Sequence, residues 1–150
     1  MSWAAQEADK IASAERQLSD ERTWILHCKE IVGREGPLFF AALSGQMEAY
    51  VREFNEHLSS NIEVEKAEGM IAITKQAYPT RHVRLTLTDA GVGIYTRSME
   101  SYGRVTDDRR DTMRFAVERD GETVTLDGSN HEALARRILS SVFAAFSPRR

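Results

Sequence analysis

The chain has 150 residues, of which 41% are hydrophobic and 29% charged, and this composition is typical of one globular domain. Its net charge of −3 gives no general attraction to phosphate backbones, which argues against nucleic acid as a partner. No apolar run approaches the ~20 residues that cross a bilayer, and the first residues lack the basic start and apolar core of a signal peptide. A single cysteine, Cys28, excludes an internal disulfide framework. We therefore expect a cytoplasmic protein without a membrane partner.

A stripe of mostly apolar and small residues runs through the first 32 positions at alternating three- and four-residue steps. This heptad stripe consists of Ala4, Glu7, Ile11, Ala14, Leu18, Glu21, Ile25, Cys28 and Val32. The spacing predicts an amphipathic helix, which we expect to end at Gly33 and Gly36. Because Ser19 and Asp20 are good N-cap residues, the alternative is a frayed segment followed by a separate helix from about Glu21.

A second helix is predicted after this break. Pro37 suits the first turn of a helix, where a missing N–H is tolerated. One broad apolar face follows, made of Phe40, Leu43, Met47, Tyr50, Val51, Phe54 and Leu58. The polar residues 59–61 are expected to end this helix. Residues 1–35 are thus predicted to form a separate N-terminal helical segment, which is a candidate oligomerisation arm.

Between Ile62 and Leu126 the apolar residues alternate one in two, which is the period of a half-buried strand. Turn residues divide this region into six short predicted strands, which cover Ile62–Glu65, Met70–Lys75, His82–Thr88, Val92–Thr96, Met113–Val117 and Val124–Leu126. Tight turns between neighbouring strands predict an antiparallel meander. The polar stretch Ser98–Asp111 is expected to be one long irregular connection, either a functional lid or a mobile loop.

A last helix is predicted to begin at a capping box, in which Ser129 is the N-cap and Glu132 follows three residues later. Its apolar face contains Leu134, Ile138, Leu139, Val142, Phe143 and Phe146, and Pro148 is expected to end it. An antiparallel sheet with alternating strands has one dry face, which helices must cover. The predicted fold is α+β, a single domain over residues 1–150 with two N-terminal helices, a six-stranded antiparallel meander sheet and a C-terminal helix packed on the sheet.

Strand parity predicts one candidate binding surface. If Val83 and Leu85 face the core, the side chains that alternate with them point to the other face of the sheet. The surface predicted in this way combines His82, Arg84, Tyr95, Arg97 and Arg114. Arginine side chains and a tyrosine ring suit a small anionic ligand or a protein partner. The alternative is an ordinary solvated strand face.

The N-terminal stripe predicts a second contact surface, made of Ile11, Leu18, Trp24 and Ile25. Because this segment is longer than a compact domain of this size needs, we expect it to bury its stripe against a protein partner or a second copy in a homodimer. The alternative is that the segment packs on its own sheet.

The sequence contains no familiar motif for a metal, a cofactor, a phosphate-binding loop or an activated nucleophile, so no cofactor and no metal are expected. We therefore predict a small non-enzymatic interaction module, such as an adaptor, a chaperone-like factor or an immunity-type protein. The alternative is a ligand-binding or catalytic pocket between the curved sheet and the last helix. Such a pocket would be lined by Leu85, Ile94, Phe115, Val124, Ile138 and Val142.

Overall fold

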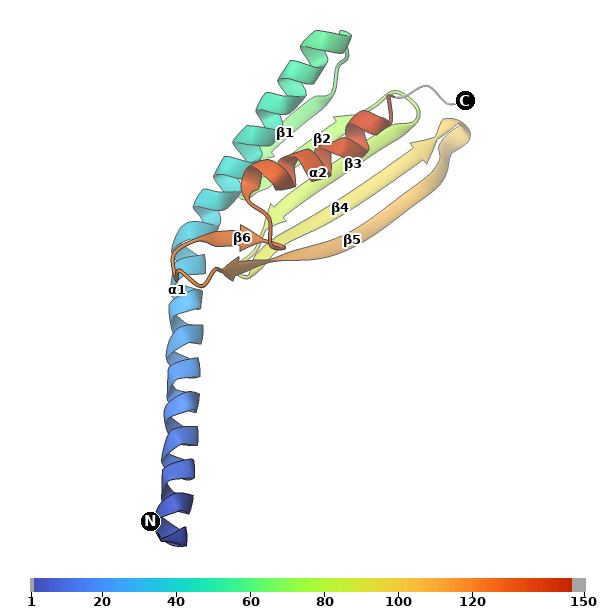
Figure 1. Ribbon diagram of the computed structural model, residues 1–150. Helices are drawn as coiled ribbons and strands as arrows, with labels where there is room; N and C mark the ends of the chain where they lie inside the picture. The colour runs from blue at the N-terminus through green and yellow to red at the C-terminus, as the bar shows by residue number, and fades with distance from the viewer. Residues whose placement is uncertain (1, 147–150) are drawn as a thin grey trace.

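The fold is a long N-terminal helix, a six-stranded sheet and a C-terminal helix (Figure 1), seen in a computed structural model that describes residues 2–146. The elements are α1 (Trp3–Leu58), β1 (Glu63–Ala67), β2 (Met70–Lys75), β3 (Thr80–Leu87), β4 (Gly91–Glu100), the 3-10 turn η1 (Ser101–Gly103), β5 (Arg104–Val117), β6 (Val124–Leu126) and α2 (His131–Ala144). The α+β class is therefore confirmed.

One helix replaces the two that were predicted at the N-terminus. α1 is continuous over 56 residues, so the expected ends at Gly33 and Gly36 are wrong, as is the alternative start near Glu21. Pro37 lies inside the helix. Local helix-breaking tendencies are overcome because α1 packs on the core from Ile31 onward, and packing contributes more to a helix than propensity does.

The six strands form one antiparallel meander in the order β1-β2-β3-β4-β5-β6, as the alternation of apolar residues predicted. Val83 and Leu85 are 2% and 0% exposed, so the parity assigned to β3 is confirmed. The register between β4 and β5 shifts at one irregularity, between Ser98 and Met99.

The expectation of a long irregular connection over Ser98–Asp111 is wrong. β4 continues to Glu100 and β5 begins at Arg104, so most of this stretch is a paired hairpin closed by η1. Tyr102 and Gly103, both with φ of 74°, turn the chain. The hairpin lacks the alternation of apolar residues because few of the side chains on β5 are buried, and the two faces of the strand are polar alike.

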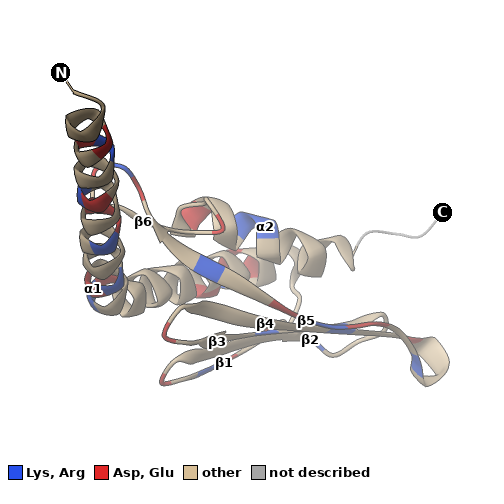
Figure 2. Ribbon diagram, turned by 90° about the horizontal axis from the view of Figure 1, so that it is seen from below, with Lys and Arg blue, Asp and Glu red and all other residues tan. Residues whose placement is uncertain are grey.

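The core lies between the sheet and the two helices. Figure 2 shows α2 and the C-terminal part of α1 on the same side of the sheet, with the other face open. Leu43 and Met47 from α1, Ile71 and Leu85 from the sheet, and Leu134 from α2 are fully buried in one cluster. The helices contact each other through aromatic rings, since Phe54 and Phe143 stack with centroids 4.0 Å apart.

The start of α2 differs by one residue from the prediction. Asn130, and not Ser129, is the N-cap, and its Oδ1 accepts a hydrogen bond from the backbone N–H of Ala133 at 2.8 Å. The backbone of Ser129 is already engaged with Leu126 in a tight turn. Glu132 forms an ion pair with Arg136 one turn later. Pro148, which was predicted to end this helix, lies outside the described residues.

Candidate interaction surface

The N-terminal half of α1 extends away from the rest of the molecule (Figure 1). Every residue from Ala8 to His27 is exposed, and we call residues 3–28 the arm. Ser2 caps the arm, because its Oγ accepts a hydrogen bond from Ala5 N–H at 3.3 Å. The alternative that this segment packs on its own sheet therefore does not hold for the arm, apart from the contacts at its base.

The arm exposes the side chains that were predicted to form an interface. Ile11, Leu18 and Ile25 from the heptad stripe are 60%, 52% and 53% exposed, and Trp24 is 43% exposed. Trp3, at the tip, is 76% exposed. Exposed apolar side chains are ordinary when single, but a row that extends over several helical turns is typical of an interaction surface.

The arm meets the body of the protein at the turn between β5 and β6. His27 donates its Nε2–H to the carbonyl oxygen of Gly121 at 2.7 Å, and the ring of Trp24 lies 5.9 Å from that of His27. The side chain of Asp120 fixes this turn, since its Oδ1 accepts the backbone N–H groups of Glu122 and Thr123, both at 2.9 Å. This contact anchors the base of the arm.

A groove of about 870 Å³ opens at the base of the arm, between α1, the β3–β4 turn and the end of β5. Its walls are made of Trp24, Ile25, Cys28, Lys29, Val32, Gly33, Gly36, Pro37, Leu87, Thr88, Asp89, Ala90, Phe115, Ala116 and Val117. A Cβ added at Gly36 would lie 3.1 Å from Phe115 Cε2, so helix and strand approach closely there. A Cβ added at Gly33 would meet no atom within 4 Å, so the groove is open beside Gly33.

The second predicted surface lies on the open face of the sheet. Cross-strand pairing places Arg84 opposite Tyr95 and Tyr95 opposite Arg110, and His82 opposite Arg97. The guanidinium carbons of Arg84 and Arg110 lie 5.3 Å and 4.6 Å from the centre of the Tyr95 ring. Tyr95 therefore lies between two cations, and each guanidinium group is attracted to the electron-rich face of the Tyr95 ring.

The members of this second surface are not equally close together. His82 joins the Tyr95 cluster, with ring centroids 6.0 Å apart. Arg114 has the same strand parity, but it pairs with Gly91, four residues along β5 from Arg110 and thus about 13 Å away. Arg110 was missed because it lies within the stretch expected to be irregular.

His82 is shielded from protonation at this surface. Its Nδ1 lies 2.9 Å from Thr74 Oγ1. Burial lowers the pKa of His82, the positive charge of Arg84 lowers it further, and Glu65 acts in the opposite direction. The imidazole is therefore held in its neutral form more strongly than in a free peptide.

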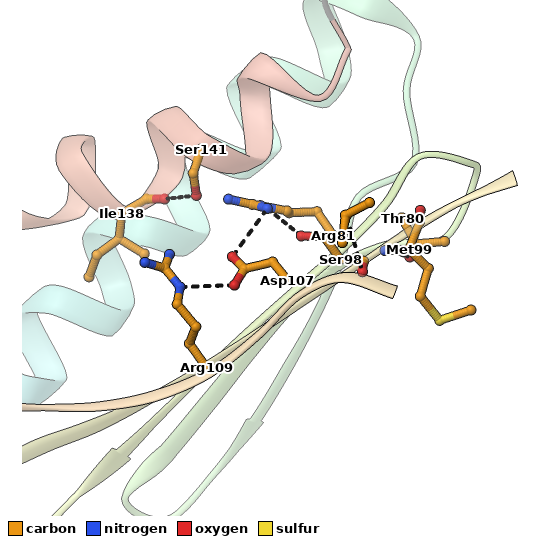
Figure 3. Close-up of polar contacts among 9 residues, drawn as sticks. Thr80, Arg81, Ser98, Met99, Asp107, Arg109, Ile138 and Ser141 are labelled. Carbon is orange, nitrogen blue, oxygen red and sulfur yellow. Dashed lines mark hydrogen bonds and ion pairs between the residues drawn. The ribbon is translucent and has the colours of Figure 1, made fainter. Parts of the chain in front are cut away.

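The opposite face of the same strands carries a network of charges (Figure 3). Arg81 hydrogen-bonds Ser98 and lies 3.7 Å from Asp107, which also forms an ion pair with Arg109 at 2.9 Å. Thr80 Oγ1 accepts the backbone N–H of Met99 at 3.1 Å. These contacts link β3, β4 and β5 at the register irregularity, and we interpret the network as structural.

The six residues predicted to line a pocket under the sheet lie in the core or pack against it, and Phe115 also lines the groove at the base of the arm. Leu85, Ile138 and Val142 belong to the buried cluster, and the other three pack against it. Their packing gives the pocket alternative no support.

Neither the described part of the structure nor comparison with known proteins points to a membrane span, a metal site or a known family. Within residues 2–146, no helix combines the length and apolarity needed to span a membrane, and no group of three or more His, Cys, Asp or Glu side chains could hold a metal ion. No family model, curated protein or solved structure matches the chain.

Proposed function

We propose that this chain is a protein-interaction module that self-associates through its arm. The observation that carries the proposal is the row of apolar side chains that α1 exposes far from its own core. Isolated helices depend on packing for most of their stability, and the arm has almost no packing within one copy. A second helix laid on the heptad stripe would supply that packing.

The charge of the arm is compatible with self-association. Residues 3–28 carry the bases Lys10, Arg16 and Arg22 against five acids, which are Glu7, Asp9, Glu15, Asp20 and Glu21. This excess of two negative charges is spread over about seven turns, so long-range repulsion between two arms is weak at physiological salt.

The proposal is tested by the mass of the chain in solution. By light scattering after size exclusion, we expect twice the 17.0 kDa of one chain. Leu18→Asp removes a large apolar side chain from the middle of the stripe and adds a third acid to Glu7 and Glu21. We expect it to weaken the dimer at least about 100-fold, because the lost apolar burial and the added carboxylate together cost several kcal/mol over the two copies.

The matched control is Leu26→Asp. Leu26 is also on the arm and is 66% exposed, but it lies about 100° around the helix from Ile25, outside the stripe. This variant should remain dimeric. A wild-type monomer at all accessible concentrations, or equal effects of the two substitutions, would contradict the proposal.

A further inference from the structure

We infer that two copies pair their arms antiparallel, and that the tip of each arm, with Trp3, enters the groove at the base of the other. This inference rests on the proposed self-association and adds to it the direction of pairing and a receiving site. Four observations support it: two acids in the stripe, the continuity of stripe and groove, the position of Trp3, and the open space beside Gly33.

The acidic residues of the stripe favour the antiparallel direction. In heptad terms Ala4, Ile11, Leu18, Ile25 and Val32 occupy one core position, and Glu7, Ala14, Glu21 and Cys28 occupy the other. A parallel pair in register places identical residues opposite each other, so Glu7 would face the partner's Glu7, and Glu21 the partner's Glu21, within the interface. An antiparallel pair places each of these acids opposite an apolar residue of the other set, which avoids the like-charge contacts.

The stripe also leads directly into the groove. Ile25, Cys28 and Val32 are its last members, and the same three side chains line the groove. A helix that covers the stripe from the tip of the arm to its base must therefore reach the groove. In an antiparallel pair the part that arrives there is the N-terminal end of the partner's arm.

The position of Trp3 fits this end point in both registers that pair nearly the whole stripe. In one, Ala4 lies opposite the partner's Cys28, and in the other Ile11 does. These registers bring Trp3 level with Lys29 or with Gly36 of the other copy, and both residues line the groove. They also place Glu7 beside a base of the partner, Arg22 or Lys29, so the charges are complementary at the ends of the overlap.

The groove has the chemistry to receive an indole ring. Gly33, Ala90 and Ala116 leave room between its apolar walls, while Thr88 and Asp89 at the β3–β4 turn provide oxygen acceptors for an indole N–H. A tryptophan buries a large apolar area and prefers a site where its N–H finds an acceptor. Within one copy the indole ring of Trp3 is exposed to solvent, so it gains such a site only by entering the groove of the partner.

The receiving site is tested with a substitution whose new side chain occupies the groove and leaves no space for Trp3 of the partner. Gly33→Leu adds a side chain where a Cβ meets no atom within 4 Å, so the fold of one copy should tolerate it. Gly45→Leu is the matched control, because Gly45 is also an exposed glycine of α1 with open space around its Cβ, and both changes raise helix propensity. We expect Gly33→Leu to raise the dimer dissociation constant at least tenfold and Gly45→Leu to leave it unchanged, as measured by sedimentation. Equal constants for the two variants would overturn the groove assignment.

The direction of pairing is tested with Cys28 as a probe under mild oxidation. Wild type should remain unlinked, because Cys28 of one chain lies far from Cys28 of the other chain in an antiparallel pair. Either Ala4→Cys or Ile11→Cys should produce a covalent dimer through Cys28 of the partner, and the same variant combined with Cys28→Ser should not. Efficient linking of wild type through Cys28 would show a parallel pair, which overturns the inference but leaves self-association intact. A monomeric mass in every sample would overturn both.

Discussion

Tyr95 is the centre of the open sheet face, and its neighbours show what parity alone can predict. His82, Arg84, Tyr95 and Arg97 were placed together correctly because side chains alternate strictly along a strand. Parity gives a face but not a distance along the strand, so Arg114 was grouped with residues that lie far from it. Arg110, which contacts Tyr95, was hidden in a polar stretch that carries no alternating signal.

At the scale of single residues we predict that Arg84→Gln raises the pKa of His82, because the positive charge that adds to the lowering by burial is removed. The pKa is measured by NMR titration of the imidazole, with Arg114→Gln as the control that should not change it. Since the folded pKa lies below the ordinary 6.5, His82 costs stability as pH falls through 6.5 toward the folded value, and Arg84→Gln should reduce that loss. An unchanged titration curve in Arg84→Gln would contradict the assigned cause.

At the scale of elements, periodicity predicted the type of each helix and strand better than its ends. Gly33, Gly36 and Pro37 are local signals for a break, yet α1 continues because Gly36 lets the helix approach Phe115 and the following turns are buried. The sequence contains the stripe on both sides of these residues, but it does not show that a sheet packs against them. The same limit applies to β5, whose strand character depends on pairing with β4.

The close packing of β4 and β5 gives a prediction at this scale. A Cβ at Gly91 would lie 1.9 Å from the carbonyl oxygen of Met113, so Gly91→Ala forces the two backbones apart. We expect a loss of about 3 kcal/mol in unfolding free energy, as for severe overpacking, measured by urea denaturation.

Gly93→Ala, two residues along the same strand, is the control. Its nearest contact would be Thr86 O at 3.9 Å, an ordinary separation, and we expect a change of at most about 0.5 kcal/mol. Similar urea midpoints for the two variants would show that the strands separate more easily than this packing indicates.

At the scale of the whole molecule, the chain has a body with one hydrophobic core and an arm without one. The change of period from helix to strand and back was sufficient to predict the α+β class, the meander and a helix at each end. It could not predict that the first half of α1 stands clear of the sheet, because the stripe would look the same in a helix that packs on its own core.

This division predicts that the helicity of the arm depends on protein concentration. A lone amphipathic helix is marginal in water, so dilution below the dimer dissociation constant should leave residues 3–22 with rapid amide hydrogen exchange. Residues 39–51, which pack in the core, should keep their protection at all concentrations. Mass spectrometry of the exchanged peptides measures both, and slow exchange of the arm in dilute samples would contradict the prediction.

The uninterrupted course of α1 has a consequence for how the open sheet faces are presented. Helix α1 is about 84 Å long at 1.5 Å per residue, and it forms both the arm and a wall of the core. In a dimer joined by such helices, the two open sheet faces that carry Tyr95 would be separated by a stiff rod and not by a flexible tether. If these faces bind a partner, their fixed spacing would favour a bivalent target of matching span, which gains avidity, over a shorter target, which could occupy only one face at a time.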